Sequence, residues 1–303
     1  MRYFMISDIH GNVQGLTAVL NHMVMVSHIN AELKEKIGDN LDDHNLPIDP
    51  NFVNARSKVS EDVIVCLGDI VGYGARPAEC TRIISKVAPT VRGNHEEYMR
   101  DLSLWKEFHD ELIHAWRWTQ DVLEKDGSLD LLMNMTRHYS FKDRNHIFSH
   151  GLPDNPRRFS YADFERSDTV SLFADPNFDE KTCFVGHSHV PGVFMKVDSP
   201  GNINYRIESP LTGGFFNRDL KEFILVGSTH VVSIPSVGQP RDRNPRAGYA
   251  VFDSDIKRLT FHRVDYDVYG AMADITNLGR LTGYGVNRKG IDSFFAERLI
   301  QGR

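Results

Sequence analysis

The stretch VIVCLGDIVGYG, residues 63–74, joins a short apolar run to a carboxylate and three glycines. The five apolar residues that end at Leu67 predict a buried strand, because strands covered on both faces are continuous apolar runs. Asp69 follows the strand directly, beside a glycine that permits a tight turn. Side chains at the carboxyl ends of strands line the ligand-binding crevice of open α/β sheets. The stretch therefore predicts an α/β fold with a functional site around Asp69.

Four further segments repeat this design, in which an apolar run ends and side chains of metal-ligand type follow. These side chains are Asp8 and His10 after YFMIS, Asn94 and His95 after TVRG, His150 after HIFS, and His187 and His189 after TCFVG. In Asp-Ile-His and His-Ser-His, the two-residue step puts both side chains on one side of an extended segment. One such histidine alone more often has a structural role, but five motifs in order predict a shared site.

The combined ligand set favours two divalent transition-metal ions. Imidazoles, carboxylates and an amide oxygen suit borderline metals better than Ca²⁺ or Mg²⁺, so Mn is our first choice, with Fe, Zn, Co or Ni as alternatives. Two divalent ions against the carboxylates of Asp8 and Asp69 leave about two net positive charges. Such a site holds a phosphate group and converts water to hydroxide near neutral pH. This chemistry predicts the hydrolysis of phosphoesters.

The rest of the chain reads as one domain, residues 1–303. Residues 13–23 and 77–87 have helical apolar patterns, a strand is expected around Val91, and a long helix over residues 104–123. Residues 26–61 are polar and rich in turn residues, which predicts a surface insertion. Residues 192–303 form short apolar runs separated by turns and end in a helical segment, which predicts hairpins followed by C-terminal helices.

Composition limits the classes of function. The net charge of −6 argues against a protein built to grip nucleic acid, which needs a basic face. Three cysteines without CxxC spacing fit no disulfide framework, and no apolar run approaches the length of a spanning helix. The N-terminus meets charge too early for a signal peptide. We therefore expect a cytoplasmic protein with a small phosphorylated substrate and no membrane partner.

The motifs DIH, GD, GNH, HG and GHSH, in this order, resemble the calcineurin-like metallophosphoesterase family. The segment SVGQPRDRNPRAGYAVFD, residues 236–253, is similar to a bacterial branch of small phosphoesterases within it. The likeness covers nearly the whole chain apart from residues 26–61. It implies a four-layer α/β/β/α sandwich, in which two mixed β-sheets are flanked by helices.

The resemblance also implies a role for each ligand, with Asp69 bridging two metal ions. The first ion is held by Asp8, His10 and His189, and the second by Asn94, His150 and His187. His95 corresponds to a histidine that binds no metal, contacts the phosphate and protonates the leaving oxygen. The implied reaction is attack of a metal-activated hydroxide on a phosphoester, assisted by His95.

The segment after Asp69 departs from two related groups, the protein serine/threonine phosphatases and the dinucleoside tetraphosphatases. Where they carry Asp-Arg, this chain has Gly72 and Tyr73, so the phosphate-gripping Arg is replaced. A diester monoanion needs less charge compensation than a monoester dianion, which slightly favours small phosphodiesters over phosphomonoesters. Tyr73, Arg92 and Arg241 are the predicted substrate contacts.

Several other functions stay open from the sequence. The segment RGNHE, residues 92–96, resembles the phosphatase version of its motif, so a protein phosphatase or a dinucleoside polyphosphate hydrolase is an alternative. A non-catalytic scaffold of the same fold is a second alternative, although every expected ligand and His95 are present. A nuclease shares the metal chemistry, but the acidic balance disfavours it.

Overall fold

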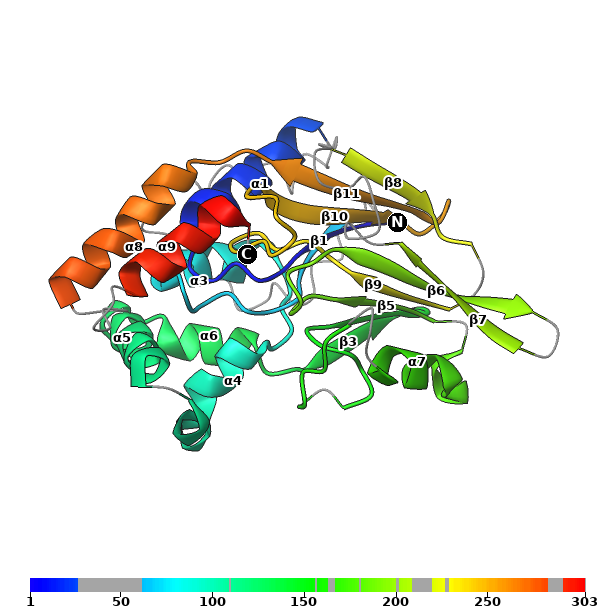
Figure 1. Ribbon diagram of the computed structural model, residues 1–303, viewed down its shortest axis with the longest axis horizontal. Coiled ribbons are helices and arrows are strands. Elements are labelled where there is room, and N and C mark those ends of the chain that lie inside the picture. Colours follow the sequence, from blue (N-terminus) through cyan, green and yellow to red (C-terminus); the bar gives the residue numbers. More distant parts are fainter. Residues whose placement is uncertain are drawn as a thin grey trace.

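The computed structural model describes residues 1–26, 62–108, 110–155, 157–162, 167–179, 181–199, 202–208, 220–226, 229–282 and 291–302. The insertion expected at residues 26–61 lies outside these residues except for its first position. Two β-sheets pack face to face, and helices cover their outer faces (Figure 1). Within the described part of the chain, every helix is too short or too polar to cross a lipid bilayer.

The first sheet has five strands, and the N-terminal strand is second from one edge. Its order is β2 (Asp62–Cys66), β1 (Arg2–Ile6), β10 (Ala247–Asp253), β11 (Arg258–Val264) and β8 (Leu220–Ile224). The β1 and β2 strands are parallel, and the other pairs are antiparallel. The sheet is therefore mixed, as expected, and the parallel pair brings the carboxyl ends of β1 and β2 to the same edge.

The second sheet has six strands and is also mixed. Its order is β3 (Ser140–Asp143), β4 (His146–Ser149), β5 (Thr182–Val185), β9 (His230–Ser233), β6 (Gly192–Ser199) and β7 (Asn202–Glu208). Only β4, β5 and β9 run parallel to one another. The segments after residue 192 supply β6, β7 and β9 of this sheet and β8, β10 and β11 of the first sheet.

Side-chain alternation along β1 shows how the layers are held together. Tyr3 and Met5 point into the apolar layer between the sheets, where they join residues of the second sheet such as Phe148. Phe4 and Ile6 point to the opposite face and pack against helices. Both faces of a strand in the middle of a sandwich are thus buried, which is why the sequence of β1 is a continuous apolar run.

Helices form the two outer layers. The α1 helix (Val13–Val26) and the α3 helix (Pro77–Val87) cover the first sheet through buried residues such as Leu20 and Ile84. The α7 helix (Ser167–Ala174) covers the second sheet with Leu172 and Phe173. The order of layers, helix, sheet, sheet and helix, confirms the predicted α/β/β/α sandwich.

The other helices gather at the end of the sandwich where the parallel strands stop (Figure 1). They are α4 (Asn94–Arg100), η2 (Leu102–Glu107), α5 (Asp110–Asp126), α6 (Leu129–Met135), α8 (Val268–Thr282) and α9 (Ile291–Gln301), while the short η3 (Pro176–Phe178) follows α7. The predicted C-terminal helices are therefore present, and α9 packs beside α8.

Two predicted elements differ in the structure. The strand expected around Val91 is reduced to a single bridge between Cys66 and Thr90, because Pro89 has no N–H to extend a ladder. The long helix expected over residues 104–123 is divided, since η2 ends before Phe108 and α5 begins at Asp110. The first error concerns a strand that is reduced to one bridge, and the second concerns where a helix begins, which sequence patterns locate least well.

Candidate metal centre

The predicted ligands converge at the carboxyl ends of four parallel strands and at the start of α4. Asp8 and His10 follow β1, Asp69 follows β2, His150 follows β4, His187 and His189 follow β5, and Asn94 and His95 begin α4. All are at most 8% exposed except His187, which is partly exposed. Strands from both sheets therefore contribute to one site, which neither sheet could form alone.

The backbone of the ligand loops is not extended, which corrects the sequence prediction. Asp8, His10 and Asp69 have φ values of 54°, 50° and 54°, and His187 and His189 have 63° and 59°. This left-handed region costs about 1 kcal/mol or more for a residue with a side chain. Tight turns thus direct the paired side chains into the site. In an extended segment, the alternation of side chains along the strand would have done so.

Backbone hydrogen bonds between the first two loops hold these turns in place. Asp8 N donates to Gly68 O at 3.0 Å, and His10 N donates to Asp69 O at 2.9 Å. The loops after β1 and β2 therefore continue the parallel pairing of their strands beyond the sheet. A Cβ on Gly93 would lie 2.1 Å from Asp69 Oδ1, so only glycine allows the start of α4 to approach this carboxylate.

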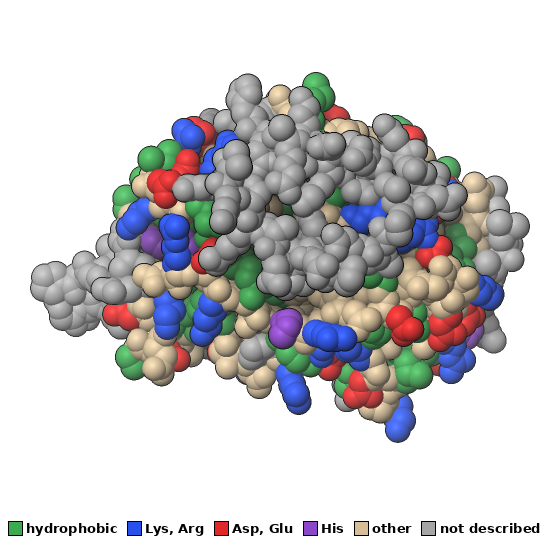
Figure 2. All heavy atoms as spheres, turned by 180° about the vertical axis from the view of Figure 1, so that it is seen from behind, with side chains coloured by type: hydrophobic (Ala, Val, Ile, Leu, Met, Phe, Trp, Pro, Cys, Tyr) green, Lys and Arg blue, Asp and Glu red, His purple; other side chains and the backbone are tan. Residues whose placement is uncertain are grey.

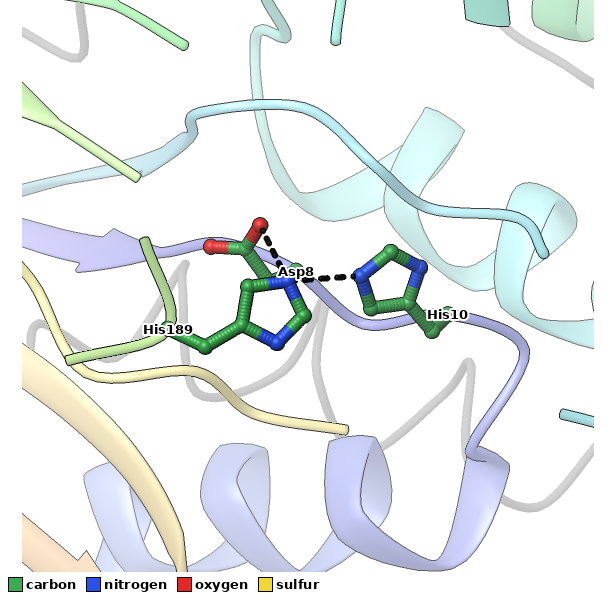
Figure 3. Close-up of side chains that lie close together, drawn as sticks. All are labelled: Asp8, His10 and His189. Carbon is green, nitrogen blue, oxygen red and sulfur yellow. Dashed lines mark hydrogen bonds and ion pairs between the residues drawn. The ribbon is translucent and has the colours of Figure 1, made fainter. Parts of the chain in front are cut away.

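One group of ligands comprises Asp8, His10 and His189, whose side chains face one another (Figure 3). His10 Nδ1 lies 3.2 Å from Val71 O, and His189 Nδ1 lies 2.5 Å from Gln239 O. A carbonyl oxygen only accepts, so each Nδ1 carries the hydrogen and donates it. Burial lowers the pKa of both rings well below their usual range, which leaves a lone pair on each Nε2.

These lone pairs point at each other and at a carboxylate. The Nε2 atoms of His10 and His189 are 3.1 Å apart, and His189 Nε2 lies 3.3 Å from Asp8 Oδ1. Three acceptors without a shared donor repel one another, whereas a cation between them satisfies all three. Metal-binding histidines commonly donate the other ring nitrogen to a carbonyl, as both rings do here. The group therefore fits a divalent metal ion.

The second group is built around His150, with Asp69, Asn94 and His187 as its neighbours. His150 Nδ1 donates to Leu67 O at 2.7 Å, and its Nε2 lies 3.1–3.2 Å from Asn94 Oδ1, His187 Nδ1 and Asp69 Oδ2. Burial lowers the pKa of His150, but the neighbouring carboxylate outweighs it and raises the pKa to about 9. Surroundings that favour a proton on Nε2 also favour a metal ion there.

Asp69 connects the two groups. Its Oδ2 lies 3.2 Å from His150 Nε2 and 3.8 Å from His10 Nε2, so one carboxylate faces both sets of ligands. Burial raises its pKa, but the neighbouring imidazoles, His150 above all, outweigh burial and hold the pKa well below its usual range. Asp69 is therefore an ionised carboxylate between two acceptor-rich groups, which fits a bridging ligand.

Glu96 is a buried residue of the site to which the sequence analysis assigned no role. Its carboxylate accepts hydrogen bonds from the backbone N–H groups of Asp69, Ile70 and Gly93, at 2.8–2.9 Å. It thereby ties the loop after β2 to the start of α4 and sets the position of Asp69. Burial, with the charge of Asp69, raises its pKa to about 7. The sequence signal was its place three residues after the helix cap, typical of a capping box.

His95 lies beside the bridging position and is held mainly by packing. Its backbone N–H donates to Asp69 Oδ1 at 2.9 Å, and its Nε2 lies 4.0 Å from Asp69 Oδ2. The rings of Tyr73 and Trp116 flank it, with centroids at 4.8 and 6.3 Å. Its buried Nδ1 has no hydrogen-bond partner among the described residues, and a Cβ on Gly72 would come within 2.0 Å of it. No carboxylate could fit there to orient the ring.

Arg92 does not join the site, contrary to the sequence prediction. Its guanidinium donates to the carbonyls of Thr136 and Arg137 and to the carboxylate of Glu97, each at 2.8–2.9 Å. The ring of Tyr139 lies 4.3 Å below the same group. Through these contacts Arg92 anchors α4 to the loop before β3. Its role in this structure is therefore to hold these two segments together.

Tyr73 and Arg241, in contrast, lie at the site. The Tyr73 ring centroid is 4.6 Å from that of His10. Burial raises the pKa of Tyr73, which keeps it a neutral phenol. Arg241 N donates to His189 O at 3.2 Å, and its Nη2 donates to Gln239 Oε1 at 3.1 Å. Both predicted substrate contacts are thus next to the first ligand group.

Comparison with known proteins identifies relatives of this arrangement. A family profile described as "Calcineurin-like phosphoesterase" matches residues 1–231. An uncharacterized protein of Methanocaldococcus jannaschii is 28% identical, with 98% of this chain and 97% of that protein aligned. The crystal structure of a metallophosphoesterase from Sphaerobacter thermophilus has a TM-score of 0.66 at 26% identity, covering 100% of both chains. A hypothetical protein of Pyrococcus horikoshii shares the fold, with a TM-score of 0.63 at 16% identity over 100% of this chain and 98% of that one.

Proposed function

Because the chain belongs to the calcineurin-like phosphoesterase family, we propose that it hydrolyses small phosphoesters with two divalent metal ions. The observation that carries this proposal is the convergence of imidazole nitrogens and carboxylate oxygens in two groups that share Asp69. The first ion is assigned to Asp8, His10 and His189, and the second to Asn94, His150 and His187. Imidazole and carboxylate ligands favour Mn, with Fe, Zn, Co or Ni as alternatives.

The metal ions, when bound, supply positive charge for the phosphate and activate water as the nucleophile. The residues of the chain hold and orient the remaining groups. Glu96 fixes the backbone of Asp69, and the carbonyls of Val71 and Gln239 fix the ring orientation of His10 and His189. Such outer contacts set the direction of each ligand, so the two ion positions are preorganised.

His95 is the proposed proton donor to the leaving oxygen. Burial lowers its pKa, so the ring is neutral at pH 7 before the substrate arrives. A phosphate group bound beside Nε2 brings negative charge that raises the pKa of the imidazole and favours its protonated form. The proton is therefore taken up with the substrate and is available when the ester bond breaks.

The structure gives little support to the alternatives. A scaffold would not need the full set of ligands and a histidine poised beside them. On the described part of the face in Figure 2, Lys and Arg side chains are interspersed with Asp and Glu, which does not suit a nuclease that tracks a phosphate backbone. A small phosphorylated substrate in the cytoplasm remains the proposal, and protein phosphatase or dinucleoside polyphosphate activity is the next candidate.

Metal analysis combined with activity assays tests the proposal. Purified protein is expected to bind up to about two transition-metal ions per chain, and chelator should abolish the hydrolysis of aryl phosphate esters. Mn²⁺ should restore it. Full hydrolysis by protein stripped of metal would contradict the proposed mechanism, and metal binding without hydrolysis of any ester would favour the scaffold.

A further inference from the structure

The imidazole of His95 is buried at the metal centre without a hydrogen bond to orient it. Its backbone is fixed, because the N–H donates to Asp69 Oδ1 at 2.9 Å. Its Nδ1 has no hydrogen-bond partner among the described residues. The χ2 torsion of histidine is broad, so the backbone alone does not set the direction of the ring. A proton donor works only in a defined orientation, which other contacts must therefore supply.

The edge of the ring that carries Nδ1 is closed by the backbone of Gly72. A Cβ at this position would lie 2.0 Å from His95 Nδ1 and 2.6 Å from its Cε1. Gly72 also has a φ of 98°, which a residue with a side chain rarely adopts. The aspartate that the related phosphatase groups carry here is therefore excluded by space and by backbone conformation.

Four aromatic rings from different segments surround the imidazole instead. The centroids of His10 and Tyr73 lie 4.7 and 4.8 Å from that of His95, at 69° and 67°. Those of Tyr98 and Trp116 lie at 5.8 and 6.3 Å, at 53° and 88°. Aromatic pairs favour tilted and edge-to-face arrangements with centroids about 4.5–7 Å apart. All four pairs meet this condition, so the rings restrict how the imidazole can turn.

The rings of Tyr98 and Trp116 are themselves held by the core beside α4 and α5. They pack against each other with centroids 4.6 Å apart, and Phe108 packs edge-on to Trp116 at 4.6 Å. Trp105 Nε1 donates to Tyr98 O at 2.8 Å, and Trp116 is only 3% exposed. Close-packed side chains of this kind keep one rotamer, so they form a firm wall for His95.

We propose that Tyr73, Tyr98 and Trp116 form an aromatic cage that positions His95 for proton transfer by packing, where related enzymes use a carboxylate. The inference rests on the proposed proton donation by His95 and names what directs that proton. The three cage residues are positioning residues, because they act through His95. Trp116 is the ring to change, since Tyr73 also packs against the metal ligand His10.

The first experiment varies the leaving group in the full-length, Mn-loaded protein. A phenyl ester needs a proton on its leaving oxygen, whereas a dinitrophenyl ester leaves without one. For Trp116→Leu we expect kcat to fall about 10–100-fold on the phenyl ester and less than about 3-fold on the dinitrophenyl ester. Metal content should not change. Trp116→Phe keeps a ring at this position and should recover most of the loss.

Trp105→Leu is the matched control, because it removes the same side chain from the same core, one ring farther from His95. It should leave the ratio of the two rates unchanged. His95→Asn shows the selectivity that loss of the proton donor produces. Equal losses on both esters in Trp116→Leu, against selective loss in His95→Asn, would overturn the cage.

The second experiment needs no turnover. In Zn-loaded protein with isotope-labelled histidine, the NMR signals of the His95 ring are identified by their absence in His95→Asn. We expect one sharp set in the native protein and in Trp105→Leu, and broadened or doubled signals in Trp116→Leu, because the ring is no longer confined. A single sharp set in Trp116→Leu would overturn the cage. If the native protein hydrolyses no ester, or His95→Asn slows both esters equally, the proposed function or the role of His95 fails, while these signals still decide whether the cage holds the ring.

Discussion

Two histidine clusters in this molecule are alike in ring stacking and burial, but the partners of their ring nitrogens differ. At the strand ends, His10 and His189 stack with centroids 4.8 Å apart at 27°. On the outer face of the first sheet, His262 stacks on Tyr249 with centroids 4.5 Å apart at 4°, and His22 lies edge-on to both. Burial lowers the pKa of these four histidines.

The clusters differ in what faces the lone pairs. His22 Nδ1 lies 3.0 Å from the Tyr249 hydroxyl, which donates or accepts as needed. At the strand ends, two Nε2 atoms and a carboxylate face one another without a donor that all three share. His22 and His262 also belong to a regular helix and strand, whereas His10 and His189 have left-handed backbone. Burial and a lowered pKa therefore do not identify a metal site, while unmatched acceptors do.

The largest effect is expected when the bridging carboxylate is changed. Asp69→Asn should reduce turnover at least about 10³-fold and lower the metal content, because one side chain serves both ions. His262→Phe removes a histidine from the other cluster and should leave both quantities unchanged. Metal content and kcat are measured for the two variants side by side. If both quantities fell in both variants, the two clusters would not differ in function.

Within the strand-end cluster, meaning the metal ligands and His95, one substitution should affect turnover and another should affect metal binding. His95→Asn is expected to lower kcat about 10²–10⁴-fold with metal content retained, whereas His187→Asn should lower metal occupancy. The distinction needs measurement because the ligand atoms of His95, His10 and Asp69 also lie within 4.8 Å of one another. An equal loss of metal in both variants would make His95 a ligand.

The outer cluster, meaning His22, Tyr249 and His262, should make the free energy of unfolding depend on pH in the acid range. Burial lowers the pKa of His262 to about 4, below the unfolded value near 6.5. As pH falls, the unfolded chain takes up the proton first, so this contribution to stability is complete above about pH 6.5. It declines toward pH 4, by on the order of 2–3 kcal/mol.

His262→Phe, which keeps the stacking partner of Tyr249, should remove this part of the acid sensitivity. Urea unfolding at pH 8 and pH 4.5 measures it, with chelator present so that loss of metal contributes to neither protein. An identical fall in the free energy of unfolding for both proteins would show that His262 is not the responsible group.

The smallest effect is expected at the hydroxyl of the outer cluster. Tyr249→Phe removes the hydrogen bond to His22 and should lower the free energy of unfolding by about 1 kcal/mol. Turnover and metal content should not change, because no ligand of the strand-end cluster contacts this ring. A measurable drop in metal content would mean that the two clusters are coupled through the first sheet.

The sequence was sufficient for the parts of the fold and site that follow from local pattern. Asp8, Asp69 and His150 were found because each directly follows an apolar run, and a strand end is a place that pattern can locate. The layered architecture came from the family resemblance, and the structure confirms it. The left-handed turns were missed because a two-residue step fits an extended segment equally well.

The missed residues depend on contacts that no local pattern encodes. Glu96 matters because backbone N–H groups 26 and 27 positions earlier point at it. Arg92 was assigned to the substrate because it precedes the GNH motif, but Glu97 and two carbonyls engage its guanidinium first.

The left-handed backbone also limits how this site can change during evolution. Asp and His, with Asn, are the side-chain types that tolerate this conformation best, and all five left-handed ligands are Asp or His. Replacement by Cys would supply a soft thiolate ligand but would strain a turn that the surrounding hydrogen bonds hold fixed. The backbone thus restricts which amino acids can occupy these positions. It thereby also restricts the range of metals that descendants of this chain could bind.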